Sequence, residues 1–434
     1  MIKRQLLKNN SLHLLKATTQ SISTGLGAQL LLLVSGPLVA RILGVDGRGY
    51  LAALNAWATM LGIVGTLGVP VACAYFLNQS STYKDRLVGE AYRIAFLQAL
   101  ALTGVLALTL FAWSRGKPIE VQTSIYVTLL IIPAILFHQY SLAILQGHQQ
   151  FWTFNVMRIL PLTFYVLGVV MLFFLNQNHL IVVVVIWTSA NLLAAIISTS
   201  VVLKTTQIDW HGETGLRKQL LQFGLRGHLG AVAPLDGLRL DQLAASIFLA
   251  PAALGLYVVA QAFTNLPRFI SQSAGMVAYP SVALQQKAPT AAIRLIWNYF
   301  WGVTLINSLL ALLLIFTMPF LIPFFFGQDF ASSIPIAQIL IVGTTFAASR
   351  RILVEGMRGL GHPQISTFAE VSMYPWLLSG GIFLLWQYNI EGLAVAVTIA
   401  YALSLFVAVV RTLKAINDIP ESISKRTGIS TSTG

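Results

Sequence analysis

The chain has 434 residues, of which 56% are hydrophobic and only 9% are charged. This composition excludes an ordinary soluble globular protein and indicates a chain whose solvent is largely lipid. The formal net charge of +13 is spread over many short segments, as in inner-membrane proteins, and we expect no nucleic-acid binding. The single cysteine, Cys73, excludes an internal disulfide framework and a cysteine-rich metal site.

A bilayer core needs about 20 apolar residues per helix, and twelve stretches of the chain meet this requirement. The basic N-terminus precedes the first of them without a cleavage pattern, so it is interpreted as a signal anchor that is retained as a span. The predicted spans lie near residues 19–40, 50–77, 94–113, 123–145, 154–175, 180–203, 220–249, 255–280, 295–318, 334–353, 365–386 and 390–410.

The positive charges predict the orientation of these spans. Of the 27 lysines and arginines, 21 fall in the two termini and the even-numbered loops, and four fall in the odd-numbered loops. Arg239 and Arg268 remain, inside predicted spans. Because positive residues accumulate on the cytoplasmic side, we expect a multi-pass inner-membrane protein with both termini in the cytoplasm.

A polar linker, residues 204–219, divides the chain into two similar halves. Residues 47–53 parallel residues 254–260, and residues 145–150 parallel residues 359–364. Both halves begin on the same side, so the repeat is parallel, with its axis along the membrane normal. We predict an all-α fold of two six-helix lobes, 1–203 and 220–415, around a central cavity, and a polar, disordered tail at 416–434.

Charges inside an apolar span are costly and usually functional. With the turn between spans seven and eight near residue 252, Arg239 and Arg268 lie at similar depths near mid-membrane, and we expect them to form an anion site for a pyrophosphate group. Asp236, three residues before Arg239 on the same helix, could neutralise it, whereas Asp241 would face elsewhere. The alternative interpretation is that these charges form ion pairs that only hold helices together.

Three further residues are candidates for weaker roles. Arg226, near the cytoplasmic mouth of span seven, could contact substrate or reach the lipid headgroups. Asp241 and Glu370 could carry a coupling proton or cation. For Glu370 the alternative is an ion pair with Arg350, Arg351 or Arg358.

No motif in the sequence indicates catalysis. The phosphate-binding pattern G-x-x-x-x-G-K-[ST], the zinc pattern H-E-x-x-H and the nucleophile pattern G-x-S-x-G do not occur. We therefore expect a protein that is not an enzyme and that uses no cofactor or metal. Any driving energy would come from an ion gradient, the membrane potential or consumption of the product.

Three segments carry a family likeness: Pro37 to Gly44 running into Gly49-Tyr50, Arg239 to Leu243 running into Gly255 to Ala260, and Leu360 to Pro363. With the six-plus-six pattern, they resemble the polysaccharide flippases of the multidrug/oligosaccharidyl-lipid/polysaccharide (MOP) exporter superfamily. The resemblance implies translocation of an undecaprenyl-pyrophosphate-linked oligosaccharide for O-antigen, capsule or exopolysaccharide assembly, with a polysaccharide polymerase and assembly machinery as possible partners. The alternatives are a flippase of another lipid, such as the peptidoglycan precursor, and a cation-coupled multidrug exporter.

Overall fold

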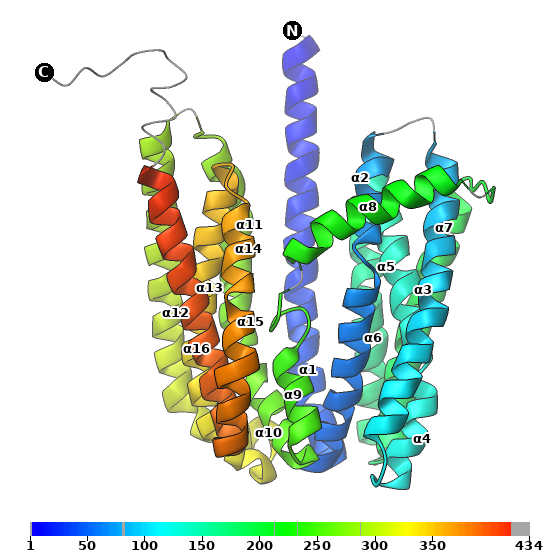
Figure 1. Cartoon of the computed structure of the whole chain (residues 1–434), viewed down its shortest axis with the longest axis vertical. Helices are drawn as coiled ribbons and strands as arrows, with labels where there is room; N and C mark the ends of the chain where they lie inside the picture. The colour runs from blue at the N-terminus through cyan, green and yellow to red at the C-terminus, as the bar shows by residue number, and fades with distance from the viewer. Residues whose placement is uncertain (1, 80–82, 212, 232, 287, 418–434) are drawn as a thin grey trace, which may run out of the picture. The chain divides into compact units, whose positions relative to one another are not determined.

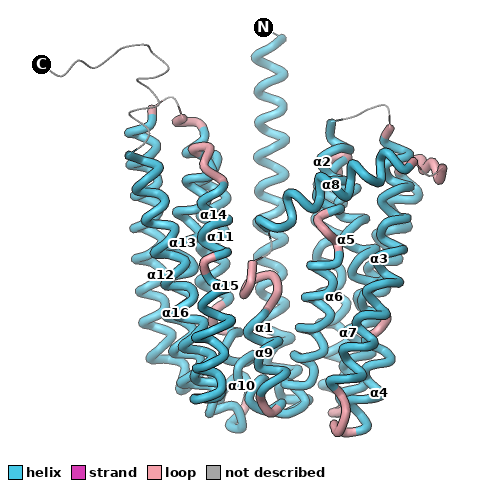
Figure 2. The backbone as a smooth tube through the Cα atoms, in the orientation of Figure 1, coloured by secondary structure: helices cyan, strands magenta, loops and turns pink. Residues whose placement is uncertain are grey.

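The computed structural model describes residues 2–79, 83–211, 213–231, 233–286 and 288–417, and within these segments the secondary structure is helical throughout. Figure 2 shows the helices with the short loops that join them. The chain forms two compact units: Met1–Val232 with Asp236–Gly255, and Ala233–Leu235 with Leu256–Gly434. The predicted tail lies almost entirely outside the described residues.

The first unit contains the helices coloured from blue to green in Figure 1. Their bounds are α1 (Ile2–Gly65), α2 (Val69–Gln79), α3 (Lys84–Trp113), α4 (Ile119–Thr128), α5 (Ile131–Gly147), α6 (Phe151–Phe174), α7 (Leu180–Thr205), α8 (Thr214–Ala231) and α9 (Leu240–Phe248). Helix α10 (Pro251–Ala262) begins in the first unit and continues into the second.

The second unit continues with helices of uneven length. They are α11 (Asn265–Ala283), α12 (Pro289–Phe326), a 3₁₀ helix η1 (Gln328–Ser333), α13 (Ile334–Gly359), α14 (Gln364–Val371), α15 (Met373–Trp376), a π-helical turn η2 (Leu377–Gly381) and α16 (Ile382–Asn417). Helix α13 packs against α11, α12 and α16, and so lies at the centre of this unit.

Most of the predicted spans are present. In the described part of the chain, eight helical stretches are long and apolar enough to cross a membrane. Two of them, Ser23–Gly65 and Gln364–Asn417, each cover two predicted spans. The first turns at Gly44, where φ is 63°, and the second turns at Asn389, where φ is 51°. The prediction of an all-α polytopic membrane protein is confirmed.

The predicted spans seven and eight are broken instead of continuous. Helix α8 ends at Ala231, a turn follows, and α9 begins only at Leu240. The turn contains Pro234, which cannot donate a backbone hydrogen bond, and Gly237, which favours non-helical backbone. Span eight is likewise divided between α10 and α11, with Pro267 in the first turn of α11, where proline is well tolerated.

The boundary between the two compact units lies further along the chain than the linker, residues 204–219. Residues 236–255 belong to the first unit, whereas the sequence places them in the C-terminal lobe. Two contacts explain this: the indole of Trp113 donates a 2.8 Å hydrogen bond to the carbonyl of Ser246, and α9 packs against α1. The short helix α9 is therefore held by the N-terminal bundle.

Candidate functional site

Arg239 is the residue immediately before α9, and its backbone is left-handed (φ 51°, ψ 44°). This conformation costs a residue with a side chain about 1–2 kcal/mol, and strained backbone of this kind concentrates at functional sites. Asp236 is exposed in the preceding turn. The Asp236–Arg239 pair was predicted from helical spacing, and that basis is wrong because both residues precede α9.

Arg48 is an electrostatic neighbour of Arg239 that the sequence did not reveal. It lies on α1, four residues after the turn at Gly44, and its side chain is half-buried. The guanidinium of Arg239 and the hydroxyl of Tyr165 are both near enough to interact electrostatically with the guanidinium of Arg48. The buried Nε atom of Arg48 has no hydrogen-bond partner among the described residues. We call Arg48, Tyr165 and Arg239 the arginine cluster.

Two glycines bring the backbones beneath this cluster into contact. A Cβ atom on Gly49 would lie 1.8 Å from the carbonyl oxygen of Pro251, and one on Gly255 would lie 2.1 Å from that of Val45. Real side chains cannot approach a backbone atom so closely. The turn of α1 that carries Arg48 is thus held directly against the turn between α9 and α10. The glycines within residues 44–49 were a sequence signal that could have indicated this close packing. A glycine-rich segment between two predicted spans is, however, equally typical of an ordinary loop.

Asp241 lies in the first turn of α9 and is buried, as is Gln242 beside it. A carboxylate in the first turn interacts favourably with the helix dipole. Helix α9 packs against α1, and Asp241 is among its buried residues. Its predicted role in ion coupling stays a prediction.

Arg268 belongs to the second unit, where it lies near the start of α11. Its Nη2 atom donates a 2.9 Å hydrogen bond to the hydroxyl of Tyr401 on α16, and its guanidinium carbon lies 5.8 Å from the centroid of that ring. Arg239 belongs to the first unit and Arg268 to the second. The anion site that combines them stays a prediction.

Glu370 forms the ion pair that was its alternative role. Its Oε1 atom lies 2.6 Å from Nη1 of Arg350, whose side chain is only 7% exposed. The same Nη1 atom donates to the hydroxyl of Ser404 at 3.2 Å. Helices α13, α14 and α16 are joined by this network, which gives Glu370 a structural role whether or not it also carries a proton.

The remaining candidate, Arg226, is exposed on α8. Helix α8 packs against α2 and α3; a Cβ atom on its Gly224 would lie 2.7 Å from the carbonyl oxygen of Leu67. Among the described residues, no group of three or more His, Cys, Asp or Glu side chains could hold a metal ion.

The comparisons with known proteins agree with this architecture. The family model described as "Polysaccharide biosynthesis protein" matches residues 14–286. No curated protein matches the sequence. Among solved structures, the lipid II flippase MurJ in an inward closed conformation is similar with a TM-score of 0.74 and 14% identity, over 91% of this chain and 88% of that one.

Two transporters of the MOP superfamily are also similar. An inward-facing multidrug resistance MATE family transporter has a TM-score of 0.70 and 14% identity, over 91% of this chain and 96% of its own. A MOP superfamily transporter from Pyrococcus furiosus, described as having a binding pocket of reversed polarity, has a TM-score of 0.56 and 13% identity, over 93% of this chain and 96% of its own.

These likenesses show the fold, and the twelve-span layout in two lobes is consistent with them. The structural neighbours are transporters and flippases. The family match, over residues 14–286, covers more than half of the 434 residues and includes the arginine cluster. The chain belongs to the polysaccharide biosynthesis protein family of multi-pass membrane proteins, and it has the fold of the MOP superfamily.

Proposed function

We propose that this protein is a flippase that translocates an undecaprenyl-pyrophosphate-linked oligosaccharide across the inner membrane, with both termini in the cytoplasm. The family match supports a role in polysaccharide biosynthesis, and the fold supports transport of a lipid-borne molecule. The single observation that carries the proposal is the arginine cluster, because two neighbouring cations inside an apolar protein indicate an anionic ligand.

The chemistry of the cluster suits a pyrophosphate. A guanidinium presents several donors in a rigid plane, and phosphate oxygens accept them in pairs. The buried Nε of Arg48 has a donor to offer such an oxygen. The hydroxyl of Tyr165 would supply a neutral contact beside the two charges. Arg48 and Arg239 are both partly buried, so their interactions are screened less than those of fully exposed charges.

The proposed mechanism is alternating access between two lobes related by a parallel repeat. The pyrophosphate would bind the cations of the arginine cluster. Arg268, in the second unit, would be a further contact for the substrate. Transport requires binding that is weak enough to reverse, and Asp241 in the first turn of α9 would moderate the positive charge of the cluster.

Reconstitution into vesicles with a lipid-linked oligosaccharide tests this proposal. We expect Arg48→Ala and Arg239→Ala to lower the initial rate of translocation about 10- to 100-fold, because each removes a charge-assisted contact worth about 1.5–3 kcal/mol. Arg115→Ala is the matched control, since this arginine is exposed between α3 and α4. Unchanged transport in both variants would rule out the cluster as the substrate site.

Arg268 needs a separate pair of variants because its side chain also donates a hydrogen bond to Tyr401. Arg268→Ala removes both the cation and the hydrogen bond, whereas Tyr401→Phe removes only the bond. A substrate contact predicts a large loss in the first variant and near-normal transport in the second. Equal losses would assign Arg268 a structural role instead.

The same vesicles separate the competing functions. The peptidoglycan precursor lipid and a cationic dye are tested beside the oligosaccharide, with and without a proton or sodium gradient. Efflux of the cationic dye alone would favour a multidrug exporter. We do not expect this result, because the positive arginine cluster would repel a cationic dye. Translocation of the peptidoglycan precursor alone would keep the anion site but change its substrate.

A further inference from the structure

A cavity within the first unit is lined by residues of α3, α5, α7, the linker and α8, and by none of the arginine cluster. Its volume is about 610 Å³, and its lining includes Phe96, Leu97, Phe137, Leu203, Arg93 and Arg217. The size is that of a site for a small organic ligand. The walls are apolar, and the charged lining residues are both arginines.

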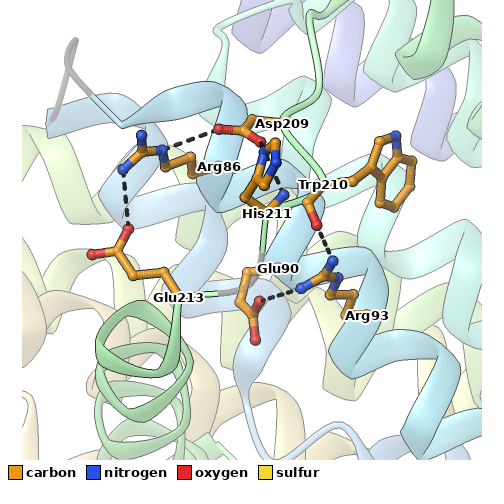
Figure 3. A network of polar contacts seen from close by, with 7 residues as sticks. All are labelled: Arg86, Glu90, Arg93, Asp209, Trp210, His211 and Glu213. Carbon is orange, nitrogen blue, oxygen red and sulfur yellow. Dashed lines mark hydrogen bonds and ion pairs between the residues drawn. The ribbon is translucent and has the colours of Figure 1, made fainter.

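The arginines are held by one buried carboxylate. Glu90 is 1% exposed, and its two oxygens lie 2.5 Å from Nε of Arg217 and 3.8 Å from Nη1 of Arg93. Figure 3 shows the guanidinium of Arg93 between Glu90 and the carbonyl oxygen of Trp210, to which it also donates. Two cations share one anion, so the group keeps a net charge of about +1 next to the cavity.

The linker completes this end of the cavity. Its backbone lies against α3 at Gly89, where a Cβ atom would be 2.2 Å from the carbonyl oxygen of Asp209. Arg86 pairs with Asp209 at 3.1 Å and with Glu213 at 3.7 Å, as drawn in Figure 3. The indole of Trp210 is thereby placed on the cavity, and tryptophan is typical of the membrane interface.

The lining combines two arginines with apolar side chains. Arg93 and Phe96 lie one turn apart on α3, Leu203 lies near the end of α7, Trp210 belongs to the linker, and Arg217 lies in the first turn of α8. Phe96 is 54% exposed. A molecule that matches this cavity has an anionic head and an apolar chain.

We propose that this cavity binds an anionic phospholipid of the leaflet that the linker faces, which the charge distribution predicts to be the cytoplasmic one. Arg93 and Arg217 bind the phosphodiester, and one acyl chain lies against Phe96, Phe137 and Leu203. The bound lipid joins the linker to α3 and α7, so it supports the segment that leads into α8. The proposal depends on neither the arginine cluster nor the identity of the transported substrate.

Native mass spectrometry of the full chain in mild detergent tests this site. Dioleoyl phosphatidylglycerol and dioleoyl phosphatidylcholine share their chains and differ in charge, so each is titrated against the wild type and three variants. Arg93→Gln with Arg217→Gln removes both cations. Leu203→Trp fills the cavity without touching the polar network. Lys218→Gln is the matched control, because it removes an exposed charge next to Arg217.

We expect one phosphatidylglycerol to bind the wild type at least 10-fold more tightly than phosphatidylcholine. The double variant should lose this preference, Leu203→Trp should lose at least 10-fold in affinity for either lipid, and Lys218→Gln should retain both. Equal binding of the two lipids, or binding unaffected by Leu203→Trp, would overturn the proposal. Equally tight binding of glycerol 3-phosphate would also overturn it, since that ligand has no acyl chain. If the double variant does not fold, Leu203→Trp decides.

Discussion

Gly49 and Gly255 occupy positions in the first unit where backbone meets backbone. Each faces a carbonyl oxygen at a distance that a side chain could not tolerate. Both glycines belong to the two segments that parallel each other in the repeat, 47–53 and 254–260. At the offset of 207, Gly49 aligns with Leu256 and Gly255 aligns with Arg48. The two glycines are therefore not equivalent in the repeat, and their close contact is a packing requirement separate from the likeness between the halves.

We expect Gly49→Ala and Gly255→Ala to destabilise the protein. A methyl group at either position forces the backbones apart, at a cost of about 1–3 kcal/mol for an overpacked contact, and shifts Arg48 relative to Arg239. Thermal unfolding in detergent measures the effect. Gly104→Ala on α3 is the control: no described heavy atom lies within 4 Å of its Cβ position, so a neutral or slightly stabilising result is expected. Equal stability of all three variants would contradict the close contact.

The residues of the candidate site show where sequence reasoning reached its limit. Arg239 and Arg268 were identified because charge is rare in apolar segments. Arg48 was missed because a charge beside a glycine-rich turn resembles an ordinary loop residue, although the next residue, Gly49, packs directly against the backbone of Pro251. Nothing local to residue 48 encodes that contact, which joins segments about 200 residues apart.

At the scale of elements, hydropathy predicted the spans that are apolar and continuous. It failed for spans seven and eight because the average over a window conceals a break. Pro234 and Gly237 end the helical run between α8 and α9, and α8 is not among the described helices apolar enough to cross a membrane. The helical spacing assumed for Asp236 and Arg239 failed for the same reason.

The linker is an element held by charges, and its attachment should depend on pH. The backbone N–H and the ring of His211 bond the carboxylate of Asp209, and with Arg86 they lower the pKa of Asp209 to about 2 from an ordinary value of 3.8. Because the folded pKa is the lower one, these contacts add stability above about pH 4 and lose it as the pH falls towards 2.

Hydrogen exchange of the linker amides between pH 5 and pH 2, corrected for the intrinsic pH dependence of exchange, measures this attachment. We expect protection to fall across that range in the wild type. Asp209→Asn cannot titrate, so its linker should be less protected at pH 5 and change little on acidification. A wild-type linker whose protection is constant to pH 2 would contradict the role of Asp209. The exposed ion pair of Arg86 with Asp209 adds little stability by itself.

For the whole molecule, the candidate arginines are divided between the two compact units differently from their division between the two halves of the sequence. At an offset of 207, Arg239 and Arg268 correspond to Leu32 and Leu61, which suggested charges confined to the second half. The compact units change this conclusion, because Arg239 folds with the first unit and has Arg48 as a neighbour. Each unit therefore carries at least one of the arginines that we propose to meet an anionic substrate.

The direction of transport depends on orientation, which the unequal distribution of positive charge predicts. Cys73 is fully buried, so the native chain should not react with a membrane-impermeant maleimide, and single cysteines can be added to it. Arg115→Cys, in the loop between α3 and α4, should be labelled in intact cells because odd-numbered loops are expected outside. Thr214→Cys, exposed at the start of α8, should be labelled only after the membrane is permeabilised. The reverse pattern would invert the protein, move the phospholipid cavity to the outer leaflet and require the arginine cluster to receive its substrate from the opposite side.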